Sequence, residues 1–156
     1  MSHELTVRQD GTVEMFSAGP EPVWHQLGQR TETAATSAAA IRMAGLDWTV
    51  AELPLEVATE QGYRLITTHK AIVREDNDAV LGIVGRRYTP LQNEEAFDWL
   101  DSLVGDRLAI YETAGSLHGG KVVWMLVRVP GELRVDGTDD VSVPYLLLCN
   151  SHDGSR

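Results

Sequence analysis

Residues 63–84 of this 156-residue chain read YRLITTHKAIVREDNDAVLGIV. Branched and aromatic side chains fill both ends of the stretch, and the polar residues 75–78 separate them. This pattern predicts two antiparallel strands joined by a turn. A further extended segment is expected at residues 53–57, where Pro54 is compatible only with an edge strand or a bend. The chain is therefore expected to be built around strands.

Two helices are expected beside these strands. Residues 34–44 are rich in alanine and predict a helix that Thr33 or Thr36 caps. Asn93 is expected to cap a second helix, which ends at Gly105, since acidic residues fill its first turn. Together the elements predict an α+β fold, a mainly antiparallel twisted sheet with two helices packed on one face. Further strands are expected at residues 5–7, 13–16, 48–50, 108–111, 122–129, 133–135 and 143–148.

Length and composition fit a single globular domain, residues 1–156, with 43% apolar residues. No apolar run approaches the roughly 20 residues that a membrane span needs. The N-terminus lacks a signal-peptide pattern and Cys149 is the sole cysteine, so a cytoplasmic location is expected. The net charge of -10 disfavours non-specific contact with nucleic acid or anionic membranes, and it would also suit a protein that mimics nucleic acid.

Three sequence features suggest a phosphate-binding or metal-binding site, but ordinary turns or a chance distribution of residues explain them better. Gly115 to Lys121 has the glycine and lysine spacing of a phosphate-binding loop, but a β-branched run follows instead of a helix. The acidic residues 75–78 lack the ligand ladder of a calcium loop. The histidines have no metal-binding spacing, so no metal and no cofactor is expected. They are His3, His25, His69, His118 and His152.

One basic cluster with an aromatic residue is a candidate nucleic-acid surface. It consists of Lys70, Arg74, Arg86, Arg87 and Tyr88. If the two strands that carry these residues pair, the side chains can share one sheet face, where bases stack on tyrosine and cations hold phosphates. A solvated sheet face that balances nearby acids explains the same residues.

A second cluster holds the residue types of a nucleophilic site. It runs from Cys149 through His152 to Asp153, and His25 could complete it from another segment. Neighbours in sequence rarely form such a site, because the base must approach the nucleophile from elsewhere in the chain. The end of a strand leading into a turn accounts for the same residues, so no catalytic residue is assigned.

Four stretches occur in order along the chain. They are PVWHQLG at residues 22–28, AGLDWTV at 44–50, RYTPLQN at 87–93, and PYLLL running into NSHDGS at 144–155. With these motifs the chain resembles a phage- and plasmid-related family that is described as a domain of unknown function. Family members continue past the last motif, so the chain is either the N-terminal part of a longer architecture or a domain that works alone.

The resemblance implies no agreed catalytic residues, but its motif positions are candidates for a functional surface. Burial of tryptophan, helix capping and turn formation explain the same residue types. The candidates are Trp24, His25, Gly28, Tyr88, Gln92, Asn93, Asn150, His152 and Asp153.

Three classes of function are open on the sequence. The first, which we favour from the family's setting, is a non-catalytic accessory protein of a phage or plasmid that acts in mobile-element DNA metabolism or recombination, as a homo-oligomer or alone, with single-stranded DNA as partner. The second is an acidic counter-defence inhibitor that binds a host protein through Asp136, Asp139 and Asp140. The third is an uncharacterised enzyme that uses His25, Cys149, His152 or Asp153.

Overall fold

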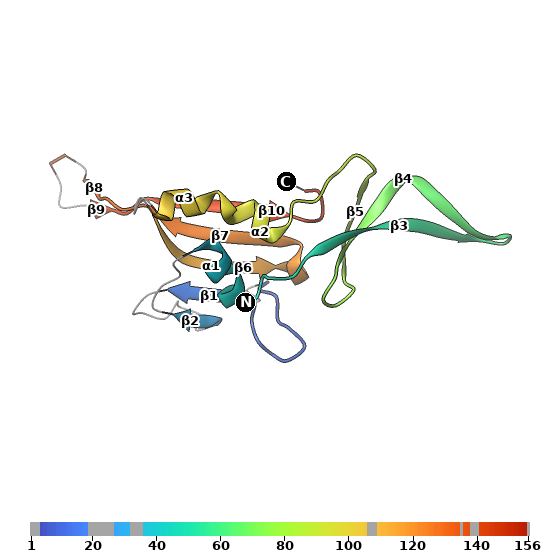
Figure 1. Cartoon of the computed structure of the whole chain (residues 1–156), viewed down its shortest axis with the longest axis horizontal. Coiled ribbons are helices and arrows are strands. Elements are labelled where there is room, and N and C mark those ends of the chain that lie inside the picture. Colours follow the sequence, from blue (N-terminus) through green and yellow to red (C-terminus); the bar gives the residue numbers. More distant parts are fainter. Residues whose placement is uncertain are drawn as a thin grey trace.

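The computed structural model describes residues 4–18, 27–31, 36–105, 109–134, 136–137 and 141–155. These residues form a five-stranded sheet in the order β10-β7-β6-β1-β2, a three-stranded sheet β3-β4-β5 and a small pair β8-β9 (Figure 1). Every pairing between these strands is antiparallel except the parallel pair β1–β2, so the expected α+β fold is confirmed. The strands are β1 (Met15–Ala18), β2 (Gln29–Thr31), β3 (Val50–Thr59), β4 (Gly62–Arg74), β5 (Val80–Gly85), β6 (Ile110–Leu117), β7 (Val122–Arg128), β8 (Leu133–Arg134), β9 (Val141–Ser142) and β10 (Tyr145–Ser151).

The first helix, α1 (Ser37–Ala44), ends at the expected residue and begins after Thr36, which is one of the two expected caps. The Thr36 side chain accepts a hydrogen bond from the Ala39 N–H at 3.1 Å, which satisfies one of the free amides of the first turn. Gly45 ends the helix in the left-handed conformation that glycine adopts without strain.

The second helix differs from the expectation in two ways. It is divided into α2 (Asn93–Asp98) and α3 (Leu100–Gly105), with Trp99 between them. Its N-cap is Gln92 and not Asn93, because the Asn93 side chain is fully buried and turns inward to donate to backbone carbonyls. Asn93 is thus the first helical residue, and its amide is used for a contact between distant segments.

The main core lies between the helices and one face of the five-stranded sheet (Figure 1). Ile41 of α1 and Phe97 of α2 are buried there with Tyr111 and Met125 of the sheet. Side chains along β10 alternate between this covered face and the opposite face of the sheet. On the opposite face, Leu147 is 58% exposed. The helices therefore share one face of this sheet, as expected.

The β3–β4 hairpin projects from the body as an arm (Figure 1). Its strands join through a two-residue turn after Thr59, and nearly every side chain between Glu52 and His69 is exposed. β3 is an edge strand with a register shift between Pro54 and Leu55, so the edge position, one of the two expected alternatives, is confirmed. No helix in the described part of the chain is long and apolar enough to cross a membrane.

The glycine-rich segment around His118 is a hairpin connection. Gly115 lies inside β6, the short 3-10 turn η1 (His118–Gly120) follows, and β7 begins at Val122. The β6–β7 pairing is antiparallel throughout, so no helix N-terminus follows the glycines as a phosphate-binding loop requires.

Candidate functional site

A buried ion cluster centred on Arg74 joins the two larger sheets. The guanidinium is 1% exposed and donates to the carboxylate of Glu14 and, at 2.6 and 2.7 Å, to that of Asp76. Ser116 also donates to Glu14 through its hydroxyl, and the Arg8 guanidinium lies 3.2 Å from the same carboxylate. Arg74 therefore cannot serve a nucleic-acid surface, because its charge is enclosed and already paired.

The aromatic ring of Trp48 links this ion cluster to the C-terminal motif. The Arg74 guanidinium carbon lies 4.2 Å from the centroid of the indole ring, within cation–π range. The His152 ring packs against the same indole with centroids 5.3 Å apart. Gly120 permits this stack, since a Cβ there would lie 3.1 Å from the Arg74 guanidinium and 3.2 Å from the indole.

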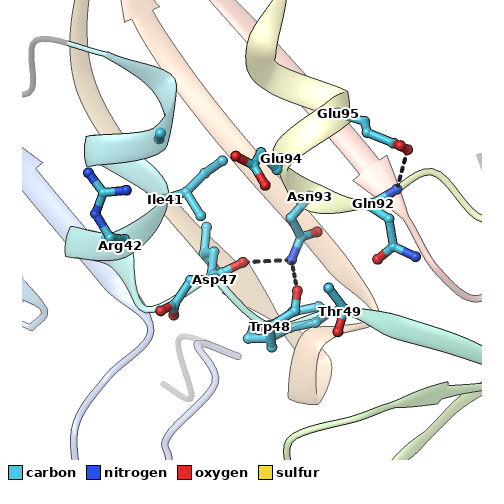
Figure 2. Close-up of a pocket in the computed structure, with 11 residues that line it drawn as sticks. Ile41, Arg42, Asp47, Trp48, Thr49, Gln92, Asn93, Glu94 and Glu95 are labelled. Carbon is cyan, nitrogen blue, oxygen red and sulfur yellow. Dashed lines mark hydrogen bonds between the residues drawn. The ribbon is translucent and has the colours of Figure 1, made fainter.

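The buried imidazole of His152 is held by Asn93. Its Nε2 lies 2.9 Å from the Asn93 Oδ1, while the Asn93 Nδ2 donates to the carbonyls of Leu46 and Trp48 (Figure 2). Because the amide oxygen can only accept, His152 is assigned as the Nε2–H tautomer. Burial lowers the pKa of His152 to about 4, so the ring is neutral near pH 7.

Two family motifs, residues 87–93 and 144–155, are bonded to each other through backbone carbonyls. The Tyr88 hydroxyl donates to the Ser151 carbonyl at 2.8 Å, and the Asn150 amide donates to the Leu91 carbonyl at 2.9 Å. The side-chain amide of Gln92 forms two hydrogen bonds with the backbone of Val50, as a neighbouring strand would. Its Nε2 donates to the Val50 carbonyl at 2.9 Å, and its Oε1 accepts from the Val50 N–H at 3.0 Å. These residues hold the segments together, which uses their polar groups for structure.

Gly28 and Asp153 lie at close backbone approaches. Gly28 has a positive φ of 88°, and a Cβ there would lie 2.7 Å from the Met15 carbonyl oxygen. A Cβ on Gly82 of β5 would lie 2.6 Å from the Cα of Asp153, so β5 and the C-terminal turn touch through backbone. The Asp153 carboxylate accepts from the Ser155 N–H, which closes that turn.

The exposed cations that remain from the basic cluster are Arg86 and Arg87. They follow β5 at the base of the arm, where the Arg86 N–H donates to the Thr68 carbonyl. Neither guanidinium forms an ion pair with another described residue. Lys70 lies in the same sheet but is bound to Glu52 at 2.6 Å. The predicted cluster is therefore reduced to an arginine pair.

Two exposed residues of the arm extend this surface beyond the arginine pair. Tyr63 is 80% exposed near the tip, and Arg64 follows it. The sequence pattern alone did not select them, because they read as ordinary strand residues.

The residues proposed for nucleophilic chemistry differ in their exposure to solvent. Cys149 is exposed on the side of β10 that faces away from the core, whereas His152 is fully buried. Trp24 and His25 lie outside the described residues, as do Asp139 and Asp140 of the acidic hypothesis. No group of three or more histidine, cysteine, aspartate or glutamate side chains in the described ranges is arranged to hold a metal ion.

A pocket of about 280 Å³ opens between α1 and the start of α2 (Figure 2). Trp48 and Asn93 line it together with Ile41, and the Trp48 indole N–H is buried without a partner among the described residues. The charged residues that line it are Arg42, Asp47, Glu94 and Glu95.

The sequence analysis did not select three residues that contact Arg74. Two of them pair with its guanidinium, Glu14 and Asp76, and Trp48 packs against it. The available signal was a charge inside an apolar strand, since Glu14 lies between Val13 and Met15 and Arg74 follows Val73. A charged residue in such a position is buried only with a partner, which marks it as part of an ion pair.

The comparisons with known proteins find one family. No curated protein and no solved structure matches the chain. The family match begins at β5, so it includes the motifs at 87–93 and 144–155 but neither 22–28 nor 44–50. Of the four motifs that carry the resemblance, only the two in the C-terminal part of the chain lie within the match. Residues 80–156 of this chain match the model of a family described as "Domain of unknown function (DUF932)".

Proposed function

We propose that the protein is a non-catalytic accessory protein of a phage or plasmid that binds single-stranded nucleic acid in mobile-element DNA metabolism or recombination. The observation that carries the proposal is the exposed pair Arg86 and Arg87 at the base of a projecting arm. Arginines without carboxylate partners on an acidic protein are available for phosphates. Tyr63 and Arg64 add an aromatic ring and a further cation along the same arm.

Single strands are favoured over duplexes for two reasons. The exposed tyrosine offers a face on which an unpaired base can stack. The total charge of -10 opposes a long duplex footprint, whereas a short strand can lie along a narrow cationic surface.

The proposal is tested by fluorescence anisotropy with labelled single- and double-stranded DNA over a range of salt concentrations. Binding should prefer single strands and weaken as salt rises. Arg86→Ala/Arg87→Ala should weaken it and reduce the salt slope by about 1.4, the value for two lost phosphate contacts. Absence of binding at low salt would overturn the proposal.

A charge-matched control is available at the other end of the molecule. Arg128→Ala/Arg134→Ala removes the same two charges from the end of β7 and from β8, far from the arm (Figure 1). Both arginines lie in ion pairs with nearby glutamates. If this variant weakens binding as much as Arg86→Ala/Arg87→Ala does, net charge and not the arm is responsible.

A further inference from the structure

The outer half of the arm has one unpaired edge on β4. β5 pairs with β4 only between His69 and Val73, and Arg86 adds one bond to the Thr68 carbonyl. Between Gly62 and Thr67, β4 is bonded to β3 on one side and to no described strand on the other. A two-stranded ribbon of this kind is only marginally stable in water by itself.

The two edges of the arm differ in how they are protected. The outer edge of β3 carries Pro54 between Glu52 and Glu56, and charge and proline discourage strand pairing. The free edge of β4 has no proline and no acid, and Leu65 on it is 53% exposed. A further strand is therefore expected at β4 and not at β3.

The turn of the hairpin determines which backbone groups face the free edge. In a two-residue hairpin, the closing residues Thr59 and Gly62 form a hydrogen-bonded pair. Hydrogen bonding alternates along a strand, so even-numbered residues of the outer arm bond β3. Tyr63 and Leu65 consequently direct their N–H and C=O groups outward, and the register of β4 against β3 shifts after Ile66.

We infer that this edge pairs with the same edge of a second copy of the chain, antiparallel and two-fold symmetric about Leu65. In this register Leu65 faces Leu65 of the second copy, and Tyr63 faces its Thr67. Arg64 faces an isoleucine, Ile66. A register centred on Arg64 would place two like charges opposite each other, which is destabilising. The result is a four-stranded sheet, β3-β4-β4-β3.

Charge complementarity favours a second copy as the occupant. The register carries the turn of one copy past Thr67 of the other and toward the end of the other's β5. The turn contains the exposed acid Glu60, and the end of β5 is followed by the exposed Arg86 and Arg87. Each two-fold dimer therefore has two acidic turns that meet two arginine pairs.

Sedimentation equilibrium of the whole chain without nucleic acid tests the inference. A concentration-dependent dimer is expected, and Leu65→Lys should raise its dissociation constant at least about tenfold by placing two cations on the axis. Val57→Lys is the matched control, since Val57 has similar exposure but lies on β3, and it should leave the dimer intact. Circular dichroism confirms that both variants fold.

A charge swap and a cross-link test the register itself. Glu60→Arg should weaken the dimer, and adding Arg86→Glu/Arg87→Glu should restore it. In a Cys149→Ser background, Leu65→Cys should form an intermolecular disulfide under mild oxidation, while Val57→Cys should not.

Three results would overturn the inference. They are a monomer at all concentrations, a dimer that Leu65→Lys leaves unchanged, and a complex of the arm with a different protein in place of self-association. Because the dimer and nucleic acid would compete for Arg86 and Arg87, sedimentation is measured without nucleic acid, so that loss of the dimer and loss of DNA binding are separate results.

Discussion

Acidification should destabilise the protein through the buried imidazole of His152. The ring titrates near its ordinary pKa of 6.5 in the unfolded chain, whereas burial lowers the pKa to about 4 in the fold. Between these values the unfolded state binds a proton that the folded state does not. The contribution of His152 to the free energy of unfolding is therefore fully present above pH 6.5. It is lost as the pH drops from 6.5 toward 4.

The size of this loss follows from the pKa difference. A lowering from 6.5 to about 4 corresponds to roughly 3 kcal/mol between neutral pH and pH 4. Urea unfolding at a series of pH values measures it. His152→Gln is the reference, because its amide can still donate to Asn93 but does not titrate. Subtracting the two curves removes the contribution of every other group.

Two results would refute this reasoning. One is a difference between the wild-type and His152→Gln curves that stays flat between neutral pH and pH 4. The other is a difference with the opposite slope, with the wild type gaining stability relative to the variant on acidification. A flat difference would mean that the ring is already accessible to protons in the fold, and the buried contact with Asn93 would then be wrong.

Three further substitutions test the packing. Glu14→Gln should cost about 3–5 kcal/mol in urea unfolding, because it leaves the buried Arg74 short of a counter-charge; a cost below about 1 kcal/mol would contradict the buried cluster. Gly82→Ala should lower the thermal midpoint, since its Cβ would lie 2.6 Å from backbone, whereas Gly85→Ala on the same strand meets open space and should be tolerated; equal effects would argue against the close approach. Gln92→Ala should cost about 1–3 kcal/mol through its two lost backbone hydrogen bonds, and a neutral result in chemical unfolding would count against them.

The local elements were largely predictable from the sequence because local signals determine them. Thr36 and Gly45 bound α1, and Pro54 marks an edge strand, since capping and proline geometry act over a few residues. The N-cap of the second helix was predicted one residue too late, because the buried Asn93 amide donates to carbonyls 45 and 47 residues earlier in the chain. Tertiary contacts of this kind leave no trace in a helical pattern.

The candidate site was predicted less well because burial depends on the whole fold. Lys70, Arg74 and Arg86 look alike in sequence, yet one is paired, one is enclosed and one is exposed. His152 and Asn93 were selected for a functional surface, and the structure places both in the interior. The resemblance selected the motifs at residues 87–93 and 144–155, but it did not predict that they are hydrogen-bonded to each other.

The cluster around Arg74 also constrains the order in which the chain can fold. Arg74 meets Glu14 across 60 residues, and Ser116 meets the same carboxylate across 102. His152, which packs on Trp48 beside them, comes later in the sequence than any of these residues. Contacts between residues so distant in sequence form slowly, because long loops must close first. The Trp48–His152 contact therefore forms only after His152 has been synthesised, and the charges of Arg74 and Glu14 stay solvated until the segment between them closes into a loop.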